Sequence, residues 1–250
     1  MTLEQRIKYQ LGMATIPLVH RLWHLFGGRS EQNRVILDRN VFVIASTISP
    51  SSSSSGDAAS RLHFSPRERF TQTMASADSI RARVPDGFII LLENSHLGGG
   101  EVDSLRKAVD WLITFDSDPM AATLRDHPNK GAGEVYMLRT IQRILSGFRY
   151  RKLFKLSGRY RLSANFKLES FPTTRFGYLR RDGAASTRLY SVPFALHRLW
   201  GRQLTSTLLA ARLGVGIESS ITRGLKATDI EWLNHIGVEG HMGDGTWLAE

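Results

Sequence analysis

Short apolar runs alternate with longer amphipathic stretches through the first two thirds of the chain. The apolar runs fall at residues 41–48, 88–92, 111–115 and 152–156. Each run is too short for a helix and is bounded by turn-forming residues, which is typical of a buried strand. The stretches between them carry apolar residues at helical spacing. The pattern therefore predicts strands joined by helices, the arrangement of a mostly parallel sheet.

The sequence also indicates where the connecting helices begin. Ser65 is followed by Pro66 and, three residues after the serine, by Glu68. This is a capping box with proline in the first helical turn. Helices are expected at about 66–83, 101–109 and 129–145.

The last third of the chain has a different pattern. Residues 176–179 and 187–192 flank a turn and are predicted to form an antiparallel hairpin. Further helices are expected at 196–213 and 228–235. We therefore predict an α/β fold: one Rossmann-like domain over residues 41–250, with a mostly parallel central sheet, flanking helices and a small antiparallel hairpin.

Residues 1–40 are expected to form a separate N-terminal amphipathic helical segment. Trp23 and Phe26 lie close to His20 and Arg21 there. Aromatic and basic residues in one helix are typical of a segment that rests on an acidic membrane surface. The alternative is a helix that packs on the core of its own domain.

Composition limits the partners and the compartment. The 250 residues have a formal net charge of +10 and no cysteine, which excludes disulfides, thiolate metal sites and cysteine nucleophiles. Such a charge favours an anionic partner, whether nucleic acid, nucleotide phosphate or membrane surface. There is no apolar run of about 20 residues and no signal-peptide pattern. We expect a cytoplasmic protein that can also bind peripherally to the inner face of a membrane.

Residues 152–162 carry the most specific chemistry. A short strand pattern that includes Lys155 stops at Ser157-Gly158, and Arg159 follows at once. Glycine allows close backbone approach, and the guanidinium of arginine binds phosphate or carboxylate with two parallel hydrogen bonds. Ligands of α/β sheets lie at the carboxyl ends of strands, where this cluster is expected. The alternative is an ordinary turn with solvated arginines.

Two further segments have chemical potential. Lys130 and the glycines that follow it precede a predicted helix, where free amides and the helix dipole favour phosphate. The spacing is not that of a Walker loop. Glu218 lies at another helix start and would act as a general base towards a hydroxyl, or else would only compensate the helix dipole.

A metal site has weaker support. Asp116 and Asp118 form a DxD after a predicted strand, which suits a divalent cation but equally suits helix capping before Pro119. The eight histidines form no HExxH motif, and the chain has neither GxSxG nor GxGxxG, so zinc, a serine triad and a Rossmann cofactor are disfavoured.

The order of these segments resembles GT-A-type glycosyltransferases over about residues 41–245. The resemblance rests on the strands at 41–48 and 88–92, the helix that carries Arg69 to Thr73, the segment 130–134 and, above all, the KLSGRY stretch of residues 155–160. It looks most like a group of bacterial and viral sugar-transferase-like proteins with a K-[IL]-S-G-R-Y strand.

The resemblance implies roles for the candidate residues. Ser157-Gly158-Arg159 stands where the superfamily usually has a metal-binding DxD, so Arg159 with Lys155 or Lys130 would neutralise the donor diphosphate. Ser157, Gly158 and Thr47 would line the donor site. Asp116 would contact the nucleoside, and Glu218 matches the late catalytic carboxylate. The resemblance implies a nucleotide sugar as the donor substrate and leaves a divalent metal open, with Asp116 and Asp118 as its candidate ligands.

The implied function is transfer of a sugar from a nucleotide sugar to a hydroxyl of a surface-polysaccharide, lipopolysaccharide or lipid-linked acceptor. The alternative is a basic module without catalysis that binds a membrane surface or, less in keeping with the resemblance, nucleic acid. Its contacts would come from basic and aromatic residues at 149–152 and 159–161. A transferase fold that serves only as a scaffold is a third possibility.

Overall fold

The computed structural model describes residues 35–49, 64–125, 127–242 and 245–250. The predicted amphipathic helix near the N-terminus lies outside the described residues. No helix in these described ranges is long and apolar enough to cross a membrane.

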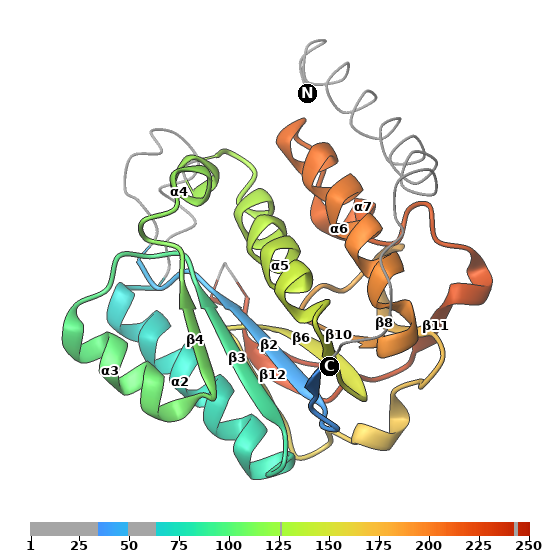
Figure 1. Cartoon of the computed structure of the whole chain (residues 1–250), viewed down its shortest axis with the longest axis horizontal. Helices are drawn as coiled ribbons and strands as arrows, with labels where there is room; N and C mark the ends of the chain where they lie inside the picture. Colours follow the sequence, from blue (N-terminus) through green and yellow to red (C-terminus); the bar gives the residue numbers. More distant parts are fainter. Residues whose placement is uncertain (1–34, 50–63, 126, 243–244) are drawn as a thin grey trace.

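A mixed sheet forms the centre of the molecule (Figure 1). Its four parallel strands are β2 (Val41–Ser46), β3 (Phe88–Glu93), β4 (Trp111–Thr114) and β6 (Lys152–Ser157). The order across the sheet is β11-β8-β10-β6-β2-β3-β4. The sequence predicted all four parallel strands, with ends that differ from the observed ones by one or two residues.

The other strands extend this sheet or form small ones. β10 (Leu189–Pro193) pairs antiparallel with β6 and with β8 (Phe176–Arg181), which confirms the predicted antiparallel element. β9 (Ala184–Ala185) pairs with the end of β8. β7 (Tyr160–Leu162), β12 (Val238–His241) and β13 (Trp247–Ala249) form a three-stranded antiparallel sheet, and β1 (Val35–Ile36) pairs with β5 (Phe148–Arg149).

One predicted helix is wrong. Residues 228–235 contain only a short 3-10 turn, Ala227–Asp229, followed by β11 (Ile230–Leu233). β11 pairs in parallel with β8, with Ile230 opposite Phe176 and Trp232 opposite Tyr178. The open edge of β8 supplies partners for these backbone groups, and this long-range pairing outweighs the local helical pattern.

Helices cover both faces of the sheet (Figure 1). α2 (Pro66–Arg83) and α3 (Gly99–Ala108) lie on one face. α4 (Pro119–Arg125), α5 (Gly131–Leu145), α6 (His197–Arg212) and the short α7 (Ile217–Ser220) belong to the other. The predicted capping box at the start of α2 is confirmed, since the side chains of Ser65 and Glu68 each accept a backbone N–H of the other.

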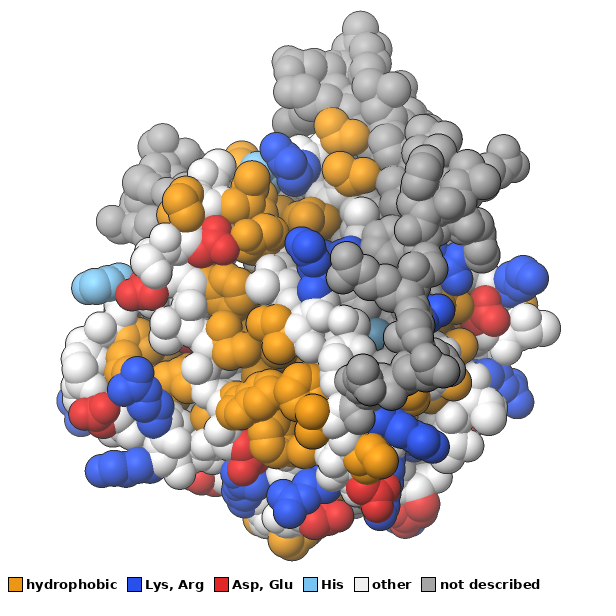
Figure 2. Space-filling model, viewed as in Figure 1, with side chains coloured by type: hydrophobic (Ala, Val, Ile, Leu, Met, Phe, Trp, Pro, Cys, Tyr) orange, Lys and Arg blue, Asp and Glu red, His pale blue; other side chains and the backbone are white. Residues whose placement is uncertain are grey.

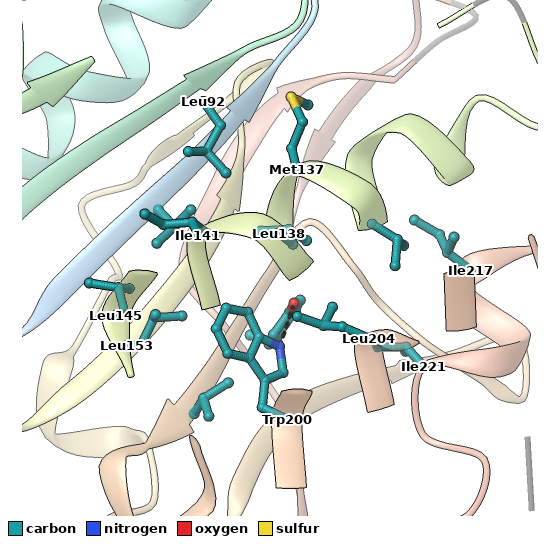
Figure 3. Close-up of a cluster of buried hydrophobic side chains, with 14 of the residues drawn as sticks. Leu92, Met137, Leu138, Ile141, Leu145, Leu153, Trp200, Leu204, Ile217 and Ile221 are labelled. Atoms are coloured by element: carbon teal, nitrogen blue, oxygen red, sulfur yellow. Dashed lines mark hydrogen bonds between the residues drawn. The ribbon is translucent and has the colours of Figure 1, made fainter. Parts of the chain in front are cut away.

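Each face has its own apolar core. Trp200 points from α6 towards α5 and lies among Leu138, Leu145 and Leu204 (Figure 3). Its indole N–H donates to the hydroxyl of Tyr190 at 3.2 Å. On the α2 face, the rings of Phe42 and Phe154 stack at 4.8 Å. Truncating such buried aromatic side chains typically costs about 3–5 kcal/mol, so these two cores fix the sheet edge that carries the site.

Candidate functional site

A cleft of about 930 Å³ opens at the carboxyl ends of the parallel strands. Its walls come from the ends of β2 and β6, the first turns of α2 and α5, the segments around β9, and α7. Six of the predicted site residues line it: Thr47, Lys130, Ser157, Gly158, Arg159 and Glu218. The topology brings together residues that are far apart in the sequence, because all four parallel strands end at this edge.

The turn at Gly158 forms the floor of the cleft. Its N–H donates to the carbonyl of Ala45 at 2.9 Å, and its carbonyl accepts from the hydroxyl of Thr73 at 3.4 Å. A Cβ at this position would lie 3.1 Å from the Cβ of Ser46. Glycine is therefore required for the close approach of the turn to β2 and α2, not for an unusual φ.

β12 packs closely against the same turn, at Arg159 and Tyr160. A Cβ at Gly240 would lie 2.4 Å from the carbonyl oxygen of Arg159. Gly240 is paired with Tyr160 in the small antiparallel sheet. The backbone that carries Arg159 is thus held between β12 and the β2–α2 side.

Two arginines face the cleft above this turn. Burial lowers the pKa of Arg69, and the positive charge of Arg159 lowers it further. The guanidinium of Arg159 lies 6.0 Å from the centre of the Tyr160 ring and has no hydrogen bond or ion pair within the described parts of the chain. Among the described residues, Arg69 donates two long hydrogen bonds, 3.4 Å to the carbonyl of Phe64 and 3.5 Å to that of Thr47. Two like charges with few partners are suited to binding an anion.

Lys155 lies below the floor, outside the lining of the cleft. Its ammonium group is fully buried and contacts a carboxylate oxygen of Glu134, the hydroxyl of Ser157 at 2.7 Å and the carbonyl of Thr187. An ammonium has three protons, and here each has an acceptor. Lys155 therefore fixes Ser157 and Glu134 in place, and a direct contact with a ligand would require it to leave these partners.

Glu218 extends from α7 into the cleft. Its Oε1 accepts a hydrogen bond of 3.1 Å from the hydroxyl of Thr187. The glutamate is exposed, so its carboxylate is accessible to a substrate hydroxyl. α7 packs closely against the start of α5. A Cβ added at Gly131 would lie only 2.6 Å from the side-chain carbon Cγ2 of Ile217.

The cleft has four further basic residues. Arg181 and Arg188 both contact the carboxylate of Glu250, at 2.7 and 2.6 Å, so they share one internal anion. Arg125 and Lys130 lie near the start of α5. Sequence reasoning missed Arg69, Arg125, Arg181 and Arg188, because an arginine that faces a cleft has no local pattern to distinguish it from one on the surface.

The predicted DxD residues lie away from the cleft lining. The carboxylate of Asp118 accepts from the backbone N–H groups of Met120 and Ala121, at 2.9 and 3.0 Å, and from the hydroxyl of Tyr136 at 2.8 Å. Asp118 thus accepts N–H groups in the first turn of α4, which is the helix-capping role given above as the alternative to metal binding. Asp116 lies 3.7 Å from the imidazole of His96. Because both residues lie outside the cleft lining and the carboxylate of Asp118 already accepts three hydrogen bonds, this pair does not fit a metal in the cleft, and the contact of Asp116 with a nucleoside stays a prediction.

Glu93 is a further buried acid that the sequence did not single out. It is fully buried at the end of β3, and burial raises the pKa of its carboxyl group. Its Oε1 accepts from the N–H groups of Ile48 and Ser95, at 3.0 and 2.8 Å. Glu93 thereby ties the loop after β2 to the end of β3, next to the cleft residue Asn94.

No protein-family model matches the chain, and no curated protein matches it. Three solved glycosyltransferases are similar in fold. The apo-form glycosyltransferase GlyE of Streptococcus pneumoniae is 11% identical, with a TM-score of 0.45 over 79% of this chain and 45% of its own. The mannosyltransferase Ktr4p of S. cerevisiae is 7% identical, with a TM-score of 0.49 over 92% of this chain and 80% of its own. The galactosyltransferase LgtC, solved with donor and acceptor sugar analogs, is 12% identical, with a TM-score of 0.44 over 78% of this chain and 73% of its own.

Proposed function

We propose that this protein is a nucleotide-sugar-dependent glycosyltransferase. The observation that carries the proposal is the pair Arg69 and Arg159, which faces an open cleft and forms no ion pair in the described residues, although the buried Glu93 is near enough to Arg69 to raise its pKa slightly against the stronger effect of burial. The same cleft holds the exposed carboxylate of Glu218. A cationic pair and a carboxylate are the two groups that sugar transfer from a diphosphate needs.

In the proposed reaction the acceptor hydroxyl attacks the anomeric carbon of the donor sugar. A carbon–oxygen bond forms there, and the bond from the same carbon to the phosphate oxygen breaks. Glu218 takes the proton of the hydroxyl, while the nucleoside diphosphate leaves with the bonding electron pair. Arg159 and Arg69 stabilise the negative charge that develops on the leaving group. We propose that Ser157, Gly158 and Thr47 line the donor site and that Lys155 acts through Ser157 and Glu134.

The acceptor class follows from the resemblance in sequence pattern. We propose a hydroxyl of a surface-polysaccharide or lipid-linked glycan, with the reaction at the cytoplasmic face of a membrane. A non-catalytic basic module has less support. Tyr150 and Tyr160 are only 3% exposed, so neither offers a free face for base stacking. On the face drawn in Figure 2, basic side chains lie scattered among side chains of other kinds and do not form one band.

The test is binding of UDP-, GDP-, CMP- and dTDP-sugars by thermal shift, with and without EDTA. We expect at least one nucleotide sugar to raise the melting temperature, and EDTA to leave the shift unchanged. Arg159→Ala should weaken that binding about tenfold or more, since it removes a charge-assisted contact. Arg161→Ala is the matched control, because Arg161 pairs with Glu239 at 2.8 Å and does not line the cleft. A flat response to all four donors would overturn the proposal.

A further inference from the structure

The cleft extends across both faces of the sheet edge, and its basic residues divide accordingly. Arg69 and Arg159 belong to the α2 side, where the neighbouring Tyr160 is part of the core beneath α2. Arg125 and Lys130 belong to the α5 side, where the adjacent Leu124 is part of the core beneath α5. A donor diphosphate bound at the first pair leaves the second pair for another group.

Neither cation on the α5 side forms an ion pair within the described residues. Nε of Arg125 is buried and has no hydrogen-bond partner in the described ranges. Lys130 is exposed, and no ion pair joins it to an acid of the described chain. A buried, unpaired guanidinium nitrogen is unfavourable unless a ligand supplies the acceptor.

Acidic residues of the cleft are engaged elsewhere. Glu134 contacts the buried ammonium of Lys155, and Glu218 accepts from Thr187. Arg181 and Arg188 share the carboxylate of Glu250. The described residues thus supply an anion to these two arginines but no ion-pair partner to Arg125 and Lys130, both of which line the cleft.

The loop that carries Lys130 is held in place. The side-chain amide of Asn129 donates to the carbonyls of Ala211 and Val215, at 3.1 and 2.7 Å, and its Oδ1 accepts from the N–H of Gly131 at 3.1 Å. These bonds fix the start of α5 against the end of α6. Little ordering is therefore needed when an anion binds, which favours affinity.

We propose that Arg125 and Lys130 form a second anion subsite, which binds a phosphate or carboxylate group of the acceptor. The proposal rests on the proposed sugar transfer and deepens it: the acceptor is an acidic glycan or sugar phosphate, not a neutral one. Electrostatic attraction to this subsite would place the acceptor hydroxyl in the cleft that holds Glu218.

The test is isothermal titration of the full chain with methyl β-glucoside 6-phosphate, methyl β-glucuronide and neutral methyl β-glucoside. We expect the two acidic sugars to bind and the neutral one to bind at least about tenfold more weakly. Lys130→Ala and Arg125→Gln should each abolish this preference, whereas Lys107→Ala, an exposed lysine of α3, should retain it. Equal affinity for the acidic and neutral sugars, or a preference that survives both substitutions, overturns the subsite.

A second titration tests whether the acidic group belongs to the acceptor or to the donor. It also separates the failure of this inference from the failure of the proposed function. With the cleft saturated by the nucleoside diphosphate of the preferred donor, the sugar phosphate should still bind, and its affinity should depend on Lys130. If the diphosphate excludes it, or if a uronic-acid donor gains Lys130-dependent affinity over its neutral counterpart, the assignment to the acceptor is overturned. Acidic-sugar binding that depends on Lys130 in a protein that binds no nucleotide would sink the proposed function and leave the anion subsite standing.

Discussion

The hydroxyl of Thr187 donates a hydrogen bond of 3.1 Å to Oε1 of Glu218 and joins the segment before β10 to α7 across the cleft. Thr187 itself is 8% exposed, and its carbonyl accepts from Lys155. The orientation of an exposed carboxylate thus depends on a residue anchored to the buried floor.

Glu218→Gln is expected to reduce kcat about 100-fold or more, because an amide cannot accept the proton of the acceptor hydroxyl. Donor affinity should be unchanged, since Glu218 contacts no phosphate in the proposed reaction. Thr187→Val should lower kcat to a smaller extent and leave the donor Kd unaltered. Single-turnover kinetics with titrated donor binding measures both, and wild-type turnover in Glu218→Gln would remove the glutamate from the reaction.

Arg69→Gln should weaken donor binding without lowering the stability of the ligand-free protein. Burial and the charge of Arg159 both lower the pKa of Arg69, so its charged form is disfavoured in the ligand-free fold. The glutamine variant should lose donor binding while its melting temperature in the absence of ligand stays equal or rises. A drop in that melting temperature of more than about 4 °C would show instead that Arg69 stabilises the fold.

Gly158→Ala should destabilise the fold by about 1–3 kcal/mol, because overpacking of a tight contact has that cost. The added Cβ would lie 3.1 Å from Ser46, 3.2 Å from Thr73 and 3.3 Å from the carbonyl of Ala45. Gly99→Ala is the control, since no atom lies within 4 Å of a Cβ in that first turn of α3. Urea denaturation of both variants measures the difference, and equal stabilities would mean that the turn adjusts freely.

Glu93 should make stability fall as the pH rises. Burial raises the pKa of its carboxyl group above the ordinary value of 4.5, so between that value and the raised pKa the folded protein binds more protons than the unfolded chain. The slope of stability against pH is then negative in this window. Glu93→Gln should remove the slope and keep the acceptor for Ile48 and Ser95. Thermal unfolding of both proteins from pH 4 upward measures it; parallel curves would contradict the assignment.

Much of the fold could be predicted from local sequence. Of the four parallel strands, β2, β3 and β6 are almost wholly buried and β4 is partly exposed, and each is a short apolar run in the sequence. The Ser65 capping box marks a helix start through contacts made within three residues. β11 could not be found in this way, because its pairing with β8 joins segments about 50 residues apart. Residues 230–233 adopt the conformation that the sheet edge imposes.

The candidate site was predicted in part for the same reason. Ser157 ends a strand and Arg159 and Thr47 follow strands, and strand ends converge by topology alone. The burial of Lys155 depends on Glu134, which reaches it from α5 on one face of the sheet. The role of Asp118 depends on whether α4 starts at the next residue. The spacing of residues in the sequence predicts neither the contact between Lys155 and Glu134 nor the start of α4.

The close packing around the turn at Gly158 and Arg159 has a thermodynamic consequence. Thr73 and Ser46 hold it on one side and Gly240 on the other, so its backbone has little freedom left to lose when a ligand arrives. Ordering a flexible loop residue costs about 1–2 kcal/mol in conformational entropy. Arg159 should incur that cost only in its side chain, and donor binding at this turn should therefore show a small entropic penalty and fast association.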